Sequence, residues 1–155
     1  MNQTPYQPPS SSLSDPQKPG TPLRAIITGT LFDLGATILM SMVFFIGYSI
    51  MLSSQGMPEQ QVLDTISNFD SISGWGLLLN GLGLLISVWA GYVCARIVQQ
   101  NVIKTVLIMA AVIAVSGTIL SGNESTTTYV VLSTIATIIA NMAGGVIYLN
   151  KKSRN

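Results

Sequence analysis

The sequence contains few charged residues and no histidine. Charged side chains make up 8% of its 155 residues, against roughly 25% in a typical soluble domain. So few charges cannot cover the surface of a water-soluble fold, which excludes a soluble enzyme. The seven Lys and Arg residues and the six Asp and Glu residues give a net charge of +1. That balance supplies no basic field for binding nucleic acid.

Cysteine is also nearly absent. With Cys94 as the single cysteine, the chain can form neither an intrachain disulfide nor a CxxC redox pair, and it has no Cys-rich zinc site. The sequence contains no GxSxG motif and no cluster of metal-ligating residues. We therefore expect no catalytic activity, no cofactor and no bound metal.

Long apolar runs dominate the rest of the chain. The hydrocarbon core of a bilayer is about 30 Å thick, which needs roughly 20 helical residues. Four runs are long enough, and they cover residues 25–52, 75–98, 102–120 and 128–149. A chain inside a bilayer must satisfy its own backbone hydrogen bonds, which favours helices. The sequence thus predicts an all-α integral membrane protein, a bundle of four transmembrane helices.

The charges divide between the two sides of this predicted bundle. Every Lys and Arg lies before the first span, beside the short link between the second and third, or after the fourth: Lys18, Arg24, Arg96, Lys104, Lys151, Lys152 and Arg154. The opposite side carries only acids, Glu59, Asp64, Asp70 and Glu124. Because positive residues accumulate in cytoplasmic segments, both termini are predicted to lie in the cytoplasm.

Three segments lie outside the predicted spans. Residues 1–22 are rich in Pro, Ser and Gln, which predicts a disordered cytoplasmic tail; a ligand for a proline-binding domain is the alternative. Residues 151–155 form a short basic tail. In the outer loop, residues 53–74, Pro58 precedes apolar residues at helical spacing, which are Val62, Leu63, Ile66 and Phe69. This pattern predicts a short amphipathic helix on the membrane surface, with a partner-binding helix as the alternative.

Asp33 is the one charge within the first span. It lies roughly 13 Å from the cytoplasmic end, where a carboxylate costs about 3 kcal/mol on insertion scales. Its neighbours at three- and four-residue steps are small or polar, namely Gly29, Thr30, Ala36, Thr37 and Ser41. We therefore expect this face to pack against protein or to meet water.

Ser87 in the second span and Asn141 in the fourth fall at about the same depth as Asp33, roughly 12–15 Å from the cytoplasmic surface. The sequence thus predicts an intramembrane polar cluster of Asp33, Ser87 and Asn141. Three interpretations remain open. Asp33 is the proton or cation site of a carrier, a protonated hydrogen-bond donor to Asn141, or the partner of a basic residue on another subunit. Without a nearby cation, we expect its carboxyl group to be protonated.

Small residues recur on one face of each span. Such residues let helix backbones approach closely inside a membrane. The strongest candidates for helix packing are Gly29, Gly83, Gly91, Ala140 and Gly144. We expect them to draw the four spans into one compact bundle.

The second span closes on the sequence AGYVCAR, residues 90–96. This stretch resembles a pattern in small, uncharacterised four-helix inner-membrane proteins of bacteria. The resemblance covers mainly this span and the overall topology, and it implies a bacterial inner membrane without implying an activity. The chain is also similar to small multidrug resistance transporters, which have four spans and a Glu in the first where this chain has Asp33. It departs from them in its outer loop, its tail and its one-sided charge, so their function is not transferred.

Two classes of function remain. The first is a non-enzymatic membrane protein that acts through contacts, as an accessory subunit, an assembly factor or an envelope component. The second is a small proton- or cation-coupled carrier or channel component that uses Asp33. The expected partners are the lipid bilayer and either another membrane protein or further copies of this chain, with no nucleic acid.

Overall fold

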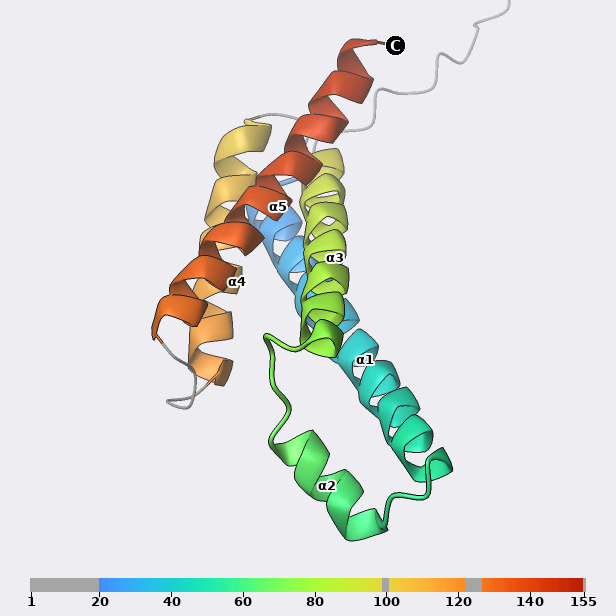
Figure 1. Cartoon of the computed structure of the whole chain (residues 1–155). Helices are drawn as coiled ribbons and strands as arrows, with labels where there is room; N and C mark the ends of the chain where they lie inside the picture. Colours follow the sequence, from blue (N-terminus) through green and yellow to red (C-terminus); the bar gives the residue numbers. More distant parts are fainter. Residues whose placement is uncertain (1–19, 99–100, 122–126, 155) are drawn as a thin grey trace, which may run out of the picture.

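The computed structural model describes residues 20–98, 101–121 and 127–154, and these residues form five helices. Figure 1 shows their order: α1 (Pro22–Ser54), α2 (Glu59–Ser67), α3 (Gly74–Val98), α4 (Val102–Ser121) and α5 (Thr127–Ser153). The described part of the chain contains no strand. Four of the helices are long and apolar enough to cross a membrane. The prediction of an all-α bundle with four membrane-spanning helices is therefore confirmed.

Local sequence signals set the ends of these helices. Pro22 opens α1 after Thr21, since proline lacks only an N–H that the first turn leaves unbonded. The helix ends before Gly56, whose φ of 81° lies in the left-handed region that favours glycine. At the start of α3, the Ser73 hydroxyl accepts the backbone N–H of Gly76 at 3.1 Å. The predicted tail at residues 1–22 lies almost entirely outside the described residues.

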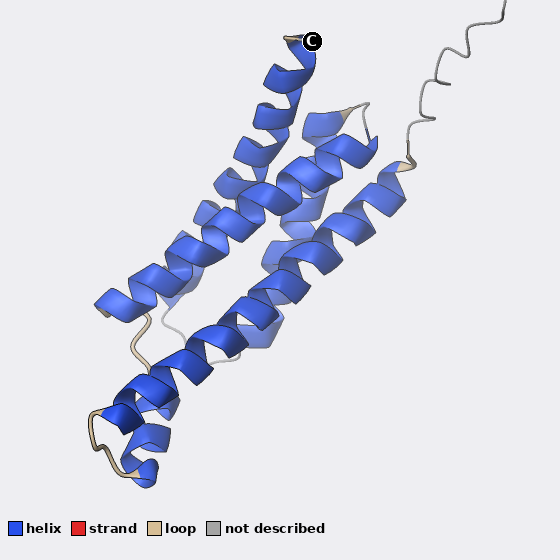
Figure 2. Cartoon of the chain, turned by 90° about the vertical axis from the view of Figure 1, so that its right-hand side faces the viewer, coloured by secondary structure: helices blue, strands red, loops and turns tan. Residues whose placement is uncertain are grey.

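Helix α3 is the centre of the bundle. It packs along α1, α4 and α5, while α4 also contacts α1 and α5. Helices α1 and α5 stand at opposite corners, and no contact joins their described residues. Figure 2 shows that α1 continues past the other long helices and that α2 folds back near its far end. The three helices around α3 therefore enclose it near one end and leave more space toward the other.

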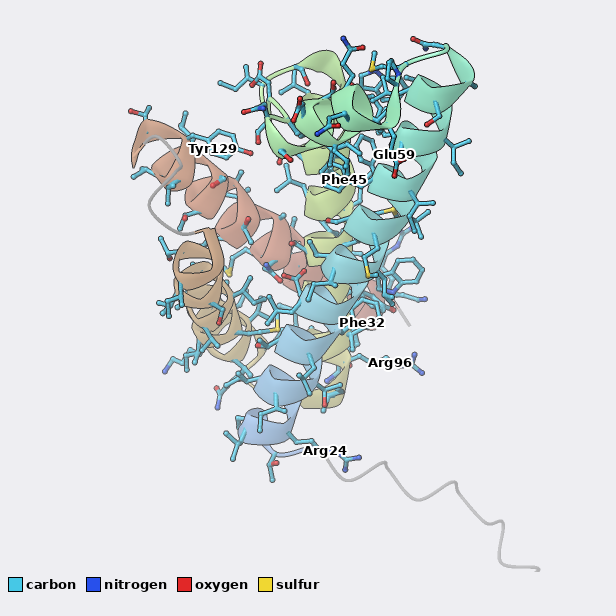
Figure 3. All side chains as sticks on the ribbon, turned by 90° about the horizontal axis from the view of Figure 1, so that it is seen from below. Arg24, Phe32, Phe45, Glu59, Arg96 and Tyr129 are labelled. Carbon is cyan, nitrogen blue, oxygen red and sulfur yellow. The ribbon has the colours of Figure 1, made fainter. Side chains whose placement is uncertain are left out.

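The tightest packing lies near the end that carries Arg24 and Arg96. The buried core there consists of Ala25, Ala90, Cys94, Ala95, Val98, Val102, Val106, Met109 and Ile113. Small side chains dominate this core, as expected where helix backbones approach closely in a membrane. In Figure 3 this end lies opposite Glu59 and Tyr129. The described Lys and Arg residues and the loop acids therefore occupy opposite ends of the bundle.

Three of the five predicted packing residues sit at close helix contacts. A Cβ added at Gly29 would collide with Met109, one at Gly91 with the carbonyl of Asn141, and one at Gly144 with the carbonyl of Val88. Ala140 is buried at 8% exposure. Gly83 differs, because a Cβ there would meet no atom within 4 Å. The structure therefore places Gly83 beside open space rather than at a helix contact.

Candidate functional site

Asp33 lies on the inner side of α1 and is only 3% exposed. The side chain of Ser87, on α3, lies beside its carboxyl group. One carboxyl oxygen, Oδ1, is buried and has no hydrogen-bond partner. No Lys or Arg among the described residues forms an ion pair with Asp33. The carboxyl group is thus held inside the bundle with one acceptor atom unsatisfied.

The structure buries all three members of the predicted polar cluster. Ser87 is 5% exposed and Asn141 is fully buried. Asn141 turns its amide nitrogen to its own helix, where it donates to the carbonyl of Thr137 at 3.0 Å. Its amide oxygen Oδ1 has no partner. Asp33 and Ser87 therefore line the same cavity, whereas Asn141 is buried on α5 and does not line it.

A cavity of about 690 Å³ extends from Asp33 toward the acidic end of the bundle. Residues of all four long helices line it, together with the segment that precedes α3. Its polar lining includes Asp33, Thr37, Ser41, Asn80, Ser87, Ser133 and Thr137. Its apolar lining includes Leu34, Met40, Leu84, Ile86 and Ile113. Gly83 also lines this cavity, which accounts for the open space beside it.

A chain of hydrogen bonds crosses the mouth of the cavity. The Tyr129 hydroxyl, at the start of α5, donates to the Asn80 side-chain oxygen at 3.1 Å. The Asn80 amide nitrogen, on α3, donates to the carbonyl of Ser71 at 3.1 Å. These bonds join α5, α3 and the loop before α3. They lie at the end of the bundle opposite the buried core. The mouth is therefore polar, and the deepest charged group behind it is Asp33.

The lining of the cavity is acidic and contains neither Lys nor Arg. Such a cavity repels anions, because an anion would face an unpaired carboxyl group in a medium of low dielectric constant. No group of three His, Cys, Asp or Glu side chains among the described residues is placed to hold a metal ion. Asp33 can therefore accept hydrogen bonds or bind a cation, and apolar residues line the cavity next to it.

Sequence reasoning missed a cluster of aromatic rings at the far end of α1. Phe69, just beyond α2, lies 5.2 Å from Phe45 and 5.9 Å from Phe44 between ring centroids. Tyr48 contacts both Phe69 and Trp75. These rings fasten α2 and the start of α3 to α1, so they fix one wall of the cavity mouth. The helical spacing of Phe69 in the loop was the one signal in the sequence that it packs inward.

Trp89, on α3, faces outward. Its side chain is 65% exposed, as are many large apolar side chains on the outer faces of the long helices. In a bilayer such faces contact lipid chains. Trp89 is therefore not part of the cavity.

No family model, no curated protein and no solved structure matches this chain. The functional argument accordingly depends on the cavity and on the residues around it.

Proposed function

We propose that this chain is a small, non-enzymatic carrier or channel component of the membrane, in which Asp33 takes up a proton or a cation. The observation that carries the proposal is a buried carboxyl group with a free oxygen at the deep end of a cavity. A charged or ionisable residue inside a membrane is costly to bury, and such residues often mark ion or proton pathways. Close packing of the helices explains the small residues near Arg96. It does not explain the 690 Å³ cavity that Asp33 lines.

We further propose a bacterial inner membrane and cytoplasmic termini. The placement of Arg24, Arg96 and Lys104 at one end, with Glu59 and Asp64 at the other, supports this orientation through the positive-inside rule. In that orientation the cavity mouth faces the non-cytoplasmic side. The ligand would enter from outside, and Asp33 would lie nearer the cytoplasm.

Proton flux into liposomes tests the carrier proposal. The purified full-length chain would be reconstituted with a pH-sensitive dye inside, and a potassium gradient with valinomycin would impose a membrane potential. Organic amines and inorganic monovalent salts would be added outside in separate trials. We expect one of them to start a proton flux that is lost in Asp33→Asn, because Asn keeps the shape of Asp but cannot titrate.

The control is Leu107→Ala, which truncates a half-exposed side chain of α4 that does not line the cavity. It should retain the full flux. The carrier proposal is wrong if liposomes with the wild-type chain behave like empty ones, or if Asp33→Asn is as active as wild type.

A second candidate function is that of an accessory subunit that acts through contacts with another membrane protein. One observation favours it: Gly35 and Gly47 lie on α1 where a Cβ would meet nothing within 4 Å. Glycines with open space beside them on a membrane helix provide a surface on which another helix can pack closely. Co-purification in mild detergent, followed by mass spectrometry, tests this candidate. A membrane protein recovered in a fixed ratio that Gly35→Leu abolishes would support it, and recovery of this chain alone would contradict it.

A further inference from the structure

The base of the cavity region is unusual because it presents oxygen atoms that lack donors. Three buried side-chain atoms have no hydrogen-bond partner among the described residues: Thr30 Oγ1, Asp33 Oδ1 and Asn141 Oδ1. Asp33 and Asn141 are more than nine-tenths buried. A buried acceptor without a partner costs free energy, so native proteins rarely leave one unsatisfied. For the carboxyl oxygen of Asp33 and the amide oxygen of Asn141, the missing partner is a group that donates hydrogen bonds.

Position ties these oxygens to the cavity. Asp33 lines it directly, and Thr30 lies one helical turn before Asp33 on α1. Thr137 also lines the cavity, and the Asn141 amide is bonded to the carbonyl of Thr137 one turn away. A donor that reaches Asp33 from the cavity thus meets the Oδ1 atom of that carboxyl group, which has no other partner.

The apolar lining of the cavity favours a ligand with an apolar part. Leu34, Met40, Leu84 and Ile113 are among the apolar residues that line the cavity. The volume of 690 Å³ lies in the range of about 300–1,000 Å³ that is usual for small-molecule sites. A lone proton or a small inorganic ion would satisfy Asp33 but would leave this apolar space without contacts.

We propose that the cavity binds a protonated primary amine with an apolar body, with its ammonium group on Asp33. A primary ammonium carries a positive charge and three N–H donors but no acceptor, which complements a buried carboxylate that has one oxygen without a partner. Its charge also neutralises Asp33 inside the membrane. This inference names the substrate class of the proposed carrier and so depends on that function for its biological meaning, although the binding site can be tested alone.

The path into the cavity fits a cation. The mouth is formed by Ser71, Asn80 and Tyr129, which are neutral and polar. Glu59, Asp64 and Asp70 belong to the same end of the bundle. Acidic residues near an opening raise the local concentration of cations. An amine would therefore meet an attractive field outside, a polar ring at the mouth and a carboxylate at the deep end.

Direct binding to the full-length chain in uncharged detergent micelles tests the proposal. The probe is tritiated n-hexylamine, measured by scintillation proximity, with n-hexanol, hexyltrimethylammonium and NaCl as competitors. Hexanol has no charge, and hexyltrimethylammonium has no N–H donor. We expect each to compete at least about tenfold more weakly than unlabelled hexylamine, since charge-assisted hydrogen bonds are lost in both. NaCl at matched ionic strength should not displace the probe.

Three variants distinguish binding in the cavity from nonspecific binding to the protein or the micelle. Asp33→Asn should weaken hexylamine binding by at least about tenfold because the ammonium loses its charged acceptor. Gly83→Phe adds a ring to the open side of the cavity without altering Asp33, so it should also abolish binding. Leu107→Ala, which truncates a half-exposed side chain of α4 that does not line the cavity, should bind as wild type does. Size-exclusion profiles of all variants would show that they remain folded.

The outcomes distinguish this inference from the carrier proposal. Binding that survives Asp33→Asn and Gly83→Phe, or a quaternary amine that competes as well as hexylamine, overturns the amine site. If hexylamine does not bind but another cation drives an Asp33-dependent flux, the carrier stands and the substrate class is wrong. If hexylamine binds at Asp33 but no flux is found, the site stands and the carrier proposal fails.

Discussion

The backbone of Gly91 on α3 lies directly against the backbone of Asn141 on α5, with no room for a side chain between them. One turn further toward the C-terminus of α5, Gly144 meets the carbonyl of Val88 in the same way. These two contacts bring α3 and α5 together just below the cavity. They therefore set how far the helices can separate above it.

Replacing Gly91 with alanine should destabilise the fold. The added methyl group would collide with the Asn141 carbonyl, and overpacking of this kind costs about 1–3 kcal/mol. The control is Gly83→Ala, where a methyl group has open space and alanine favours the helix by about 1 kcal/mol. Thermal unfolding in micelles should show a lower midpoint for Gly91→Ala and an unchanged or higher midpoint for Gly83→Ala. Equal midpoints would contradict the close contact.

Cys94 should be inert in the native protein. Its side chain is fully buried in the tight core beside Ala90 and Val98. A membrane-permeant maleimide should leave the folded chain unlabelled and react only after heating or in SDS, because the reagent needs contact with the sulfur. Ser67→Cys, made in a Cys94→Ala background, places a thiol on the exposed surface of α2 and should react at once. Rapid labelling of native Cys94 would mean that the core is open.

Phe69→Ala should release α2 from α1. Phe69 is the ring that contacts Phe44, Phe45 and Tyr48 together. Its loss removes several edge-to-face contacts of about 0.5–1.5 kcal/mol each. Hydrogen exchange followed by mass spectrometry should show faster exchange in Glu59–Ser67 and unchanged exchange in α5. Ile72→Ala, which truncates a side chain that is 69% exposed, serves as the control.

Tyr129→Phe should loosen the cavity mouth. The change deletes only the hydroxyl that donates to Asn80, a bond worth about 1 kcal/mol. Spin labels at the outward-facing positions Leu78 and Val131, on α3 and α5, would report the spacing of these helices. The distance distribution should broaden in Tyr129→Phe and stay narrow in Tyr148→Phe, at the other end of α5. An unchanged distribution would show that the bond does not hold the mouth.

A reporter fusion checks the proposed orientation. A fluorescent protein that matures only in the cytoplasm should be bright when fused after Asn155. Alkaline phosphatase, which is active only outside the cytoplasm, should be inactive at that position and active when inserted after Gln55. The reverse pattern would mean that the positive end faces outward and that the cavity opens to the cytoplasm.

The sequence was sufficient for the helices and for the inward direction of Asp33. The lengths of the spans follow from the lengths of the apolar runs. A single acid among small residues indicates a helix face that packs against protein rather than lipid. The cavity could not be predicted in this way. Gly83 and Gly91 belong to one repeating pattern on α3, yet one faces open space and the other touches α5, because the helices diverge between them. Divergence depends on crossing angles, which are set by contacts between distant segments.

The aromatic cluster was hidden for a related reason. Phe44, Phe45 and Tyr48 lie within an apolar run, where rings that face lipid and rings that face protein look alike. Their common partner, Phe69, lies in a polar loop beyond the end of α1. Only the return of α2 along α1 brings these rings together.

The length of α1 makes the protein sensitive to the thickness of its membrane. Its 33 residues span about 50 Å, whereas the hydrocarbon layer is about 30 Å thick. The helix must tilt or protrude, and the degree of tilt follows the lipid. Because the rings of Phe44 and Tyr48 attach α1 to Phe69 and Trp75, a change in tilt moves the wall of the opening as well. We therefore expect the acyl-chain length of the surrounding lipid to change the width of the entrance to Asp33.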